Sequence, residues 1–140
     1  MQLIAHYFKG QVEKTKKREY GFTLFTRSKK SLLFEGIPEK TFTVWMSHGD
    51  KIKKIPDTFE SLGNTENTSI ASFCNAKKKI YGVQFHPEVA HTQFGNIILE
   101  NFLTRICRIR PDWTMEGFIE SKIPELKRNI GKELVICALS

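Results

Sequence analysis

The order of two hydrophobic periodicities limits the folds open to this chain. Up to residue 86 the sequence favours β-strands: side chains alternate with a period of two in residues 20–26, and residues 41–46 are rich in β-branched and aromatic types. Gly49 and Asp50 are expected to break the latter strand. Further strands are expected at residues 11–17, 59–64, 69–75 and 80–86, after a short helix at residues 3–9. Strands that precede the longer helices predict an α/β or α+β chain with a mixed sheet.

Two amphipathic helices are expected in the second half of the chain. The first, residues 93–107, has Thr92 as its expected N-cap and an apolar stripe at Phe94, Ile98, Phe102 and Ile106. The second, residues 115–130, lies between Thr114 and Gly131. Its expected buried side consists of Met115, Phe118, Ile119, Ile123, Leu126 and Ile130. Pro124 inside this helix removes one backbone hydrogen bond and is expected to kink or split it.

Composition excludes several classes of protein. The 140 residues are about one domain, and 40% hydrophobic with 26% charged residues is ordinary for a globular protein. No apolar run approaches the roughly 20 residues that span a bilayer, and no signal sequence is visible, so a cytoplasmic location is expected. The three cysteines lack the Cys-x-x-Cys spacing of a zinc site and, being odd in number, argue against a disulfide framework. No metal site is expected.

The net charge of +7 gathers in residues 14–18, 51–54 and 77–79. Such a surplus attracts nucleic acid or an anionic nucleotide, but solvated hairpin turns have the same pattern. No known nucleic-acid-binding motif accompanies it, so nucleic acid is not an expected partner.

The strongest chemical signal is the tripeptide His86-Pro87-Glu88. Proline biases the preceding residue toward extended backbone, in which side chains at i and i+2 leave on the same side. His86 and Glu88 are therefore expected within hydrogen-bond reach, at the C-terminal end of the strand at residues 80–86. An imidazole oriented by a carboxylate is the base of a nucleophile–His–acid triad. The alternative, which so short a motif would favour by itself, is a strand-end histidine beside a solvated glutamate.

The residues around this pair resemble a known family. Residues 82–88, Gly-Val-Gln-Phe-His-Pro-Glu, are similar to the catalytic strand of class I glutamine amidotransferases. Three further runs narrow the resemblance to the GMP synthases: Val-Ala-His-Thr at 89–92, Val-Trp-Met-Ser-His-Gly-Asp at 44–50 and Arg-Glu-Tyr-Gly at 18–21. The resemblance implies His86 as base and acid and Glu88 as its orienting carboxylate. It also implies an α/β amidotransferase fold, a mixed sheet with flanking helices, up to residue 107.

By the same resemblance, both ends of the chain fall inside active-site motifs. Met1 and Gln2 look like the end of a Gly-x-Cys-x-Gly-Met-Gln nucleophile elbow, whose cysteine would lie just before residue 1. Residues 134–140 look like the strand that leads into the pyrophosphate loop of an ATP pyrophosphatase domain, with Ser140 as its first serine. The apolar run at 133–139 is typical of a buried parallel strand. We therefore expect a GMP synthase piece truncated at both ends: a partial amidotransferase domain (1–107), then a linker with the first pyrophosphatase helix and strand (108–140).

The resemblance also implies a glutamine-binding set. Gln2 would help to hold the substrate side chain, although a residue so near the chain end is expected to fray. The substrate's α-amino and carboxylate groups would bind the backbone of the loop formed by Ser47, His48, Gly49 and Asp50. Glycine at position 49 suits close approach to a ligand. His48 is expected to be structural or to contact substrate, because His86 already has the oriented partner.

Cys74 is a candidate substitute for the family's nucleophile. It lies in a β segment, Ser-Phe-Cys-Asn at 72–75, without the tight glycine-flanked turn that exposes a nucleophile. Packing is therefore its expected role, and its thiol is expected to react slowly.

The parent reaction implied by the resemblance hydrolyses glutamine and passes ammonia to adenylated xanthosine monophosphate, releasing GMP, AMP and pyrophosphate. ATP and magnesium belong to that parent, and no cofactor is expected in this chain. The expected partners are glutamine, a separate N-terminal half and the synthetase domain, with no membrane. The alternative is an inactive remnant or a non-catalytic binding module that keeps the fold, and the resemblance leaves open whether this chain is itself an enzyme. A sheet cut from its neighbours is expected to be marginally stable.

Overall fold

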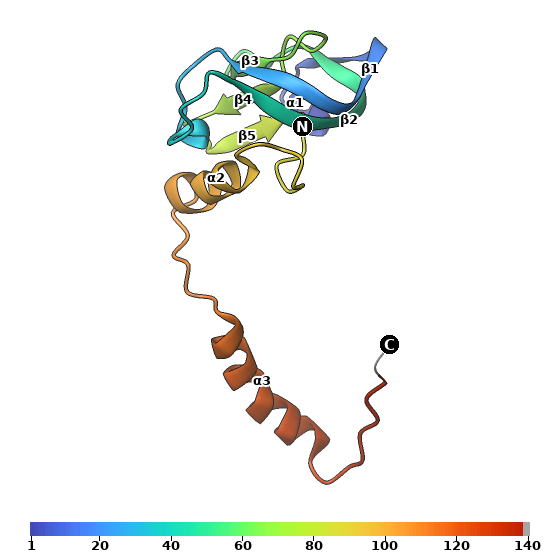
Figure 1. The fold of residues 1–140 in the computed structure, drawn as a ribbon, viewed down its shortest axis with the longest axis vertical. Coiled ribbons are helices and arrows are strands. Elements are labelled where there is room, and N and C mark those ends of the chain that lie inside the picture. The colour runs from blue at the N-terminus through green and yellow to red at the C-terminus, as the bar shows by residue number, and fades with distance from the viewer. Residues whose placement is uncertain (139–140) are drawn as a thin grey trace. The chain divides into compact units, whose positions relative to one another are not determined.

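A computed structural model describes residues 1–138, apart from the side chain of Lys16. The chain divides into a first compact unit, residues 1–109, and a second, residues 110–140. The first unit contains a five-stranded sheet in the order β2-β1-β3-β4-β5 (Figure 1). Its strands are β1 (Gln11–Arg27), β2 (Thr41–Lys54), β3 (Glu60–Asn64), β4 (Ser72–Asn75) and β5 (Ile80–Val83). None of the helices in the described residues is both long and apolar enough to cross a membrane.

Every strand pairing in the described residues is antiparallel. The mixed sheet expected from the sequence is therefore not found there. The physical reason is the length of the connections: β3, β4 and β5 follow one another through short turns, whereas parallel neighbours need a crossover of a dozen or more residues.

Strands β1 and β2 are longer than the sequence pattern predicts. The segments expected at 11–17 and 20–26 form one strand, and β2 continues through Gly49 and Asp50 instead of ending there. The irregularity is in the pairing: Lys14 pairs with Asp50 and Glu19 with His48, so residues 15–18 lie opposite the single Gly49. A bulge of this kind absorbs extra residues without ending either strand.

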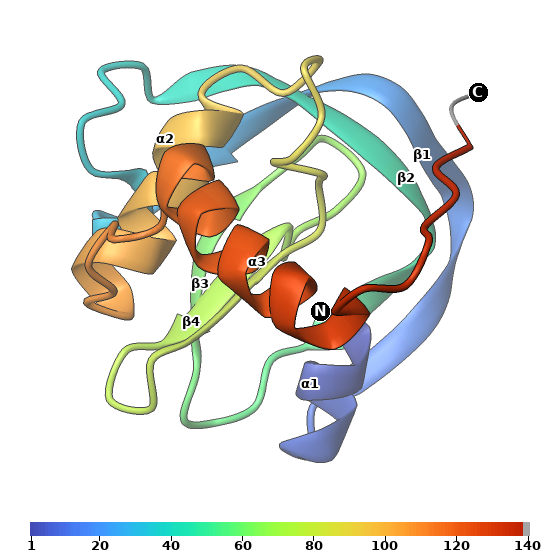
Figure 2. The ribbon, with the colours of Figure 1, turned by 90° about the horizontal axis from the view of Figure 1, so that it is seen from below.

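Two apolar cores lie on opposite faces of the sheet. Adjacent residues of β4 belong to different cores, Cys74 to the larger and Phe73 to the smaller, because successive strand side chains point to opposite faces. Helix α1 (Gln2–Tyr7) packs on the smaller core through Ala5 (Figure 2). The larger core is covered by the short helix η1 (Leu32–Phe34), by α2 (Gly95–Glu100) and by its π-helical continuation η2 (Asn101–Ile106).

The chain after β5 connects the two edges of the sheet. β5 ends at Val83, three residues earlier than expected, and the chain then runs along β2. The His86 N–H donates to the Trp45 carbonyl (3.0 Å), and the Gln93 N–H donates to the Thr43 carbonyl (3.0 Å). The sheet is thereby partly closed, and the predicted catalytic pair lies at the closure.

The second unit contains helix α3 (Met115–Ile130), which confirms the predicted bounds. The Thr114 hydroxyl caps it by accepting from the Gly117 N–H (3.1 Å), and Gly131 ends it with a φ of 61°. The helix is not split at Pro124.

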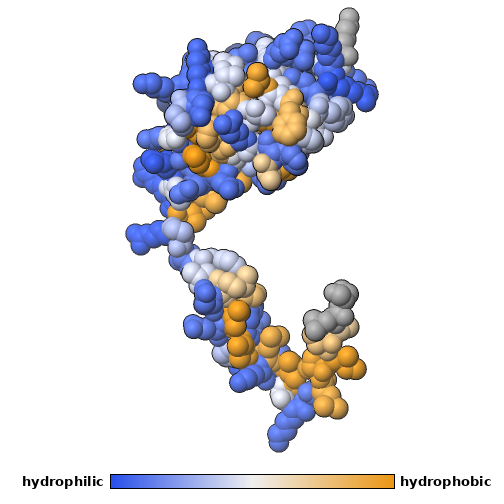
Figure 3. Space-filling model, in the orientation of Figure 1, coloured by the Kyte–Doolittle hydropathy of each residue, from blue (hydrophilic) through white to orange (hydrophobic). Residues whose placement is uncertain are grey.

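The predicted buried side of α3 is not buried. Figure 3 shows apolar side chains gathered along α3 and the segment after it, and no residue of α3 is buried in the described structure. Residues 133–138 do not form the expected strand, and Leu139 and Ser140 lie outside the described residues. Both expectations needed partner surfaces, because a buried parallel strand forms only between neighbouring strands.

The two faces of β1 predict losses of stability of different size when an aromatic side chain is truncated. Phe25 is fully buried against Phe34, Phe42 and Phe85, whereas Phe22 is 65% exposed. Phe25→Ala is expected to lower the free energy of unfolding by about 3–5 kcal/mol because it leaves a cavity. Phe22→Ala is expected to cost roughly 0.5–1.5 kcal/mol, the value of its edge contact with Trp45. Urea denaturation of the full chain measures both, and equal losses would contradict this assignment of the core.

Candidate active site

The predicted contact between His86 and Glu88 forms. His86 Nδ1 lies 2.8 Å from Glu88 Oε1 in the bend that follows β5. A carboxylate can only accept, so the hydrogen is on Nδ1 and the lone pair of the neutral ring is on Nε2. Nε2 has no hydrogen-bond partner among the described residues, and the His86 side chain is 41% exposed. The arrangement presents an oriented, basic nitrogen to solvent.

One threonine hydroxyl holds this bend against β2. Thr92 Oγ1 accepts from the Trp45 N–H (3.0 Å) and donates to the His86 carbonyl (2.5 Å). Its own N–H donates to the Val89 carbonyl (3.1 Å), which closes the turn. Thr92 is therefore not the helix N-cap expected from the sequence; that position is Phe94, in a left-handed conformation. The Thr92 hydroxyl, which the sequence pattern assigned to the helix N-cap, instead accepts a hydrogen bond from the β2 backbone.

A glycine allows helix α2 to lie directly against the bend that carries His86 and Glu88. A Cβ at Gly95 would overlap the carbonyl oxygen of Pro87. Only glycine therefore permits the observed approach between the first turn of α2 and the residue between His86 and Glu88.

A second group of predicted residues meets at the Asp50 carbonyl. The Gln2 amide donates to this oxygen (3.1 Å), and His48 Nδ1 lies 3.1 Å from it. Gln2 also donates to Gln84 Oε1 (3.1 Å). The Gln2 side chain, expected to fray, here ties α1 to β2 and to the chain after β5.

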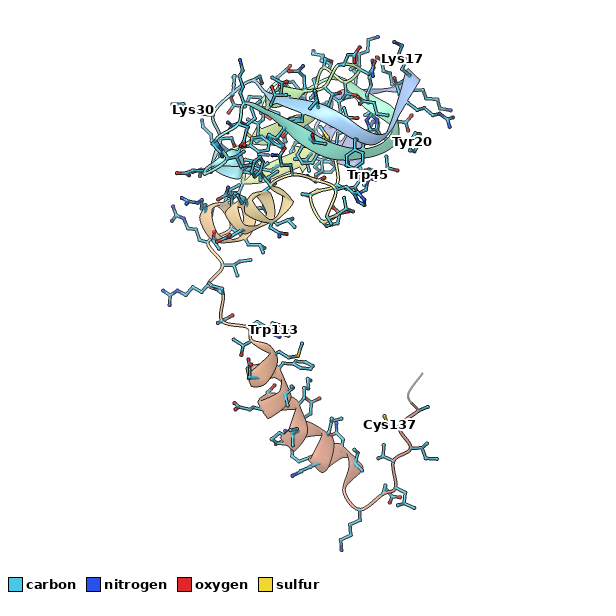
Figure 4. The ribbon with its side chains drawn as sticks, viewed as in Figure 1. Lys17, Tyr20, Lys30, Trp45, Trp113 and Cys137 are labelled. Carbon is cyan, nitrogen blue, oxygen red and sulfur yellow. The ribbon has the colours of Figure 1, made fainter. Side chains whose placement is uncertain are left out.

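Ser47 and Gly49 are placed differently from His48. Ser47 is exposed and pairs with Tyr20, on the face opposite the buried His48. Figure 4 shows Tyr20 and Trp45 on this outer face of the β1–β2 pair. A Cβ at Gly49 would meet only the Arg18 side chain, at 3.7 Å or more, so the fold itself does not demand glycine there. The structure leaves the binding roles of these residues as predictions.

Sequence reasoning missed three residues that organise the site: Glu19, Gln84 and Thr92. Gln84 is the one with a local signal, because it is a polar residue in an apolar strand, two positions before His86 and hence on its side. Glu19 and Thr92 contact partners 29 and 47 residues away, so no short-range pattern marks them.

Cys74 has the surroundings of a structural thiol. Its side chain is buried, and its Sγ lies 3.8 Å from Glu60 Oε1. Burial, followed by the nearby Glu60 carboxylate, raises the pKa of Cys74 to about 11. At neutral pH the thiolate is therefore scarce. The described residues contain no group of three or more His, Cys, Asp or Glu side chains placed to hold a metal ion.

The chain resembles known proteins over its whole length. The family Glutamine amidotransferase class-I matches residues 1–106. GMP synthase [glutamine-hydrolyzing] of Thermosipho melanesiensis is 46% identical over 140 residues, and that of Caldicellulosiruptor saccharolyticus is 48% identical over 139. These alignments cover 100% and 99% of this chain but 27% of each relative, so the chain spans about a quarter of their length.

Solved structures agree on the fold. A Thermoplasma acidophilum protein that was solved as one subunit of a GMP synthase has a TM-score of 0.72 and 34% identity, over 87% of this chain and 56% of that one. A glutamine amidotransferase of Thermotoga maritima has a TM-score of 0.58 and 24% identity, over 91% and 57% of the two chains, and supports the fold alone.

The ionisation of Glu88 reports on the contact with His86. Hydrogen bonds from its own backbone N–H and from His86 hold the pKa of Glu88 below its usual value. A lowered carboxylate pKa stabilises the folded state above the usual value of about 4.3, and this stabilisation is lost as pH falls through the folded pKa. NMR titration of the Glu88 carboxyl should show the lowered pKa, and His86→Ala should raise it part of the way back. An unchanged pKa in the variant would contradict the contact.

The Cys74 thiol should be slow toward alkylating reagents at neutral pH. Mass spectrometry after limited treatment with a glutamine-mimicking electrophile is expected to show Cys74 labelled no faster than the more exposed Cys107 and Cys137. Preferential labelling of Cys74 that disappears in His86→Ala would instead mean that the chain contains a working nucleophile–base pair.

Proposed function

The chain belongs to the class I glutamine amidotransferases, and from this premise we propose that it supplies the acid–base part of the glutaminase site of a GMP synthase. The observation that carries the proposal is the hydrogen bond between His86 Nδ1 and Glu88, which leaves Nε2 basic and open to solvent. The 46–48% identity to GMP synthases supports the choice of GMP synthase among the members of the family.

In the proposed reaction His86 moves protons in two steps. Its Nε2 takes the proton of a cysteine thiol, and the thiolate attacks the carboxamide carbon of glutamine. His86 then gives that proton to the departing nitrogen as the C–N bond breaks, which releases ammonia and leaves a γ-glutamyl thioester. Water attacks the thioester with His86 as base, and glutamate and the thiol are released. Glu88 keeps the hydrogen on Nδ1 and stabilises the imidazolium formed in each step.

The substrate would lie between this pair and the group around Asp50. Gln84 and His86 extend from the same segment after β5, while Trp45 and Asp50 both belong to β2. The hydrogen bonds that the Asp50 carbonyl makes with Gln2, His48 and Gln84 fix the segment 47–50 relative to α1. We assign the backbone of Ser47, His48, Gly49 and Asp50 to the α-amino and carboxylate groups of glutamine, and Gln2 to its side chain.

The nucleophile, in this proposal, comes from a segment outside these 140 residues. Cys74 does not provide it, because its thiol is buried and its pKa is about 11. Residues 108–140 would be the linker and the start of the ATP pyrophosphatase domain, in which ATP and magnesium activate xanthosine monophosphate to receive the ammonia. We place the parent enzyme in the cytoplasm. The partners of this chain would be glutamine, the segment that carries the nucleophile and the ATP pyrophosphatase domain.

Complementation tests the proposal. The chain is mixed with a separately produced N-terminal segment of a GMP synthase that carries the Gly-x-Cys-x-Gly elbow, and glutamate formation is measured. The mixture is expected to hydrolyse glutamine, and His86→Ala is expected to lower the rate by roughly 100-fold or more, the usual contribution of a general acid–base group. The matched control is His6→Ala, an exposed histidine of α1, which should leave the rate unchanged.

Two outcomes would contradict the proposal. The first is a mixture whose activity survives His86→Ala. The second is glutamine turnover by the chain by itself that survives Cys74→Ala. A mixture in which both segments are folded and associated but inactive would favour the alternative, an inactive module that keeps the fold.

A further inference from the structure

A buried cluster of polar side chains lies beside residues 47–50 of β2. Glu19 of β1 is 4% exposed and His48 of β2 is 7% exposed, and the two residues pair across the strands. His48 Nε2 lies 2.9 Å from Glu19 Oε2. Thr65 and Thr68, in the loop after β3, donate their hydroxyls to Glu19 at 2.7 and 2.5 Å. A carboxylate so removed from water must be compensated by its partners, and here three donors compensate it.

The hydrogen-bond partners determine where the protons are. Thr65 Oγ1 accepts from the Thr68 N–H (3.1 Å), which leaves its own hydrogen for Glu19. His48 Nε2 faces the Glu19 carboxylate, and His48 Nδ1 faces the Asp50 carbonyl (3.1 Å). An ionised Glu19 and the Asp50 carbonyl can only accept, so this geometry suits a His48 ring that carries hydrogen on both nitrogens.

The contact between Glu19 and His48 extends to the proposed glutamine site. The Asp50 carbonyl that accepts from His48 is the same oxygen that accepts from the Gln2 amide. The bulge at residues 15–18 ends at Glu19, where β1 resumes regular pairing with His48. Through His48, Glu19 thus links the bulge of β1 to the Asp50 carbonyl, which accepts from the Gln2 amide.

We propose that Glu19 is a positioning residue for the glutamine site: its buried carboxylate keeps His48 doubly protonated, so that the ring holds the Asp50 carbonyl and fixes the segment 47–50 for substrate. The inference rests on the function proposed above. A buried ion pair contributes little to stability compared with apolar packing, and geometry is the better-attested reason for one. Glu19 acts here through His48 and touches no substrate.

Glu19→Gln tests the proposal in the full chain, since it removes the charge at nearly constant shape. In the unaltered chain both ring nitrogens of His48 should have the ¹⁵N NMR shifts of an imidazolium. In the variant the ring should become neutral, and the amide hydrogens of residues 47–50 should exchange at least about tenfold faster, as expected when about 1.4 kcal/mol of local constraint is lost. Glu13→Gln is the matched control: Glu13 also lies on β1 and pairs with Lys51 and Lys53 of β2, but its side chain is 39% exposed.

Thr68→Val keeps the proposal testable if Glu19→Gln does not fold. It leaves the charge of Glu19 and removes one donor, so amide exchange in residues 47–50 should again accelerate while Glu13→Gln leaves it unchanged. A neutral His48 ring in the unaltered chain would overturn the proposal. So would unchanged exchange in residues 47–50 in whichever of the two variants folds.

A glutamine titration separates this inference from the function on which it rests. Glu19→Gln should raise the dissociation constant for glutamine at least about tenfold. An unaltered chain whose signals do not respond to glutamine, even with the elbow segment present, would count against the proposed function. The ring and exchange measurements would still decide whether Glu19 positions residues 47–50.

Discussion

The geometry of the site depends on the hydroxyl of Thr92. By accepting from β2 and donating to the His86 carbonyl, this single group fixes the bend at His86 against the strand that also carries the segment 47–50. The hydroxyl is buried, so water does not compete for either bond. The close approach of Gly95 to Pro87 confines the same bend from the other side. The orientation of His86 therefore follows from contacts made by its neighbours as much as from its own bond to Glu88.

What the sequence predicted well depends on local contacts. His86 and Glu88 meet because proline and a spacing of two residues bring them together, and α3 has the predicted bounds because its caps, Thr114 and Gly131, are adjacent to it. The roles of Glu19 and Thr92 escaped prediction because each depends on a partner dozens of residues away. Thr92 shows the competition directly: a good cap by its type and position, it bonds to a strand instead.

Burial was the property that sequence patterns predicted least. The apolar stripe of α3 and the apolar run after it are real, yet the stripe is not buried and the run is not a strand in the described residues. Period and composition indicate which face of an element avoids water, but the surface that covers the face belongs to another part of a protein. The strand end expected at Gly49 and Asp50 was also wrong, for a physical reason of its own. Glycine and aspartate weaken a strand locally, but the long pairing of β1 with β2 outweighs that preference.

The bulge between β1 and β2 divides this strand pair into two parts. The register of one part does not determine the register of the other. Shifting a strand by one residue moves its side chains to the opposite face, so a one-residue register shift in the ladder formed by residues 19–26 would turn Glu19 away from His48. Residues 15–18 lie outside the regular ladder, opposite a single glycine, and their number does not determine which residue faces His48. Related chains can therefore differ in length at this point while the buried carboxylate remains in place.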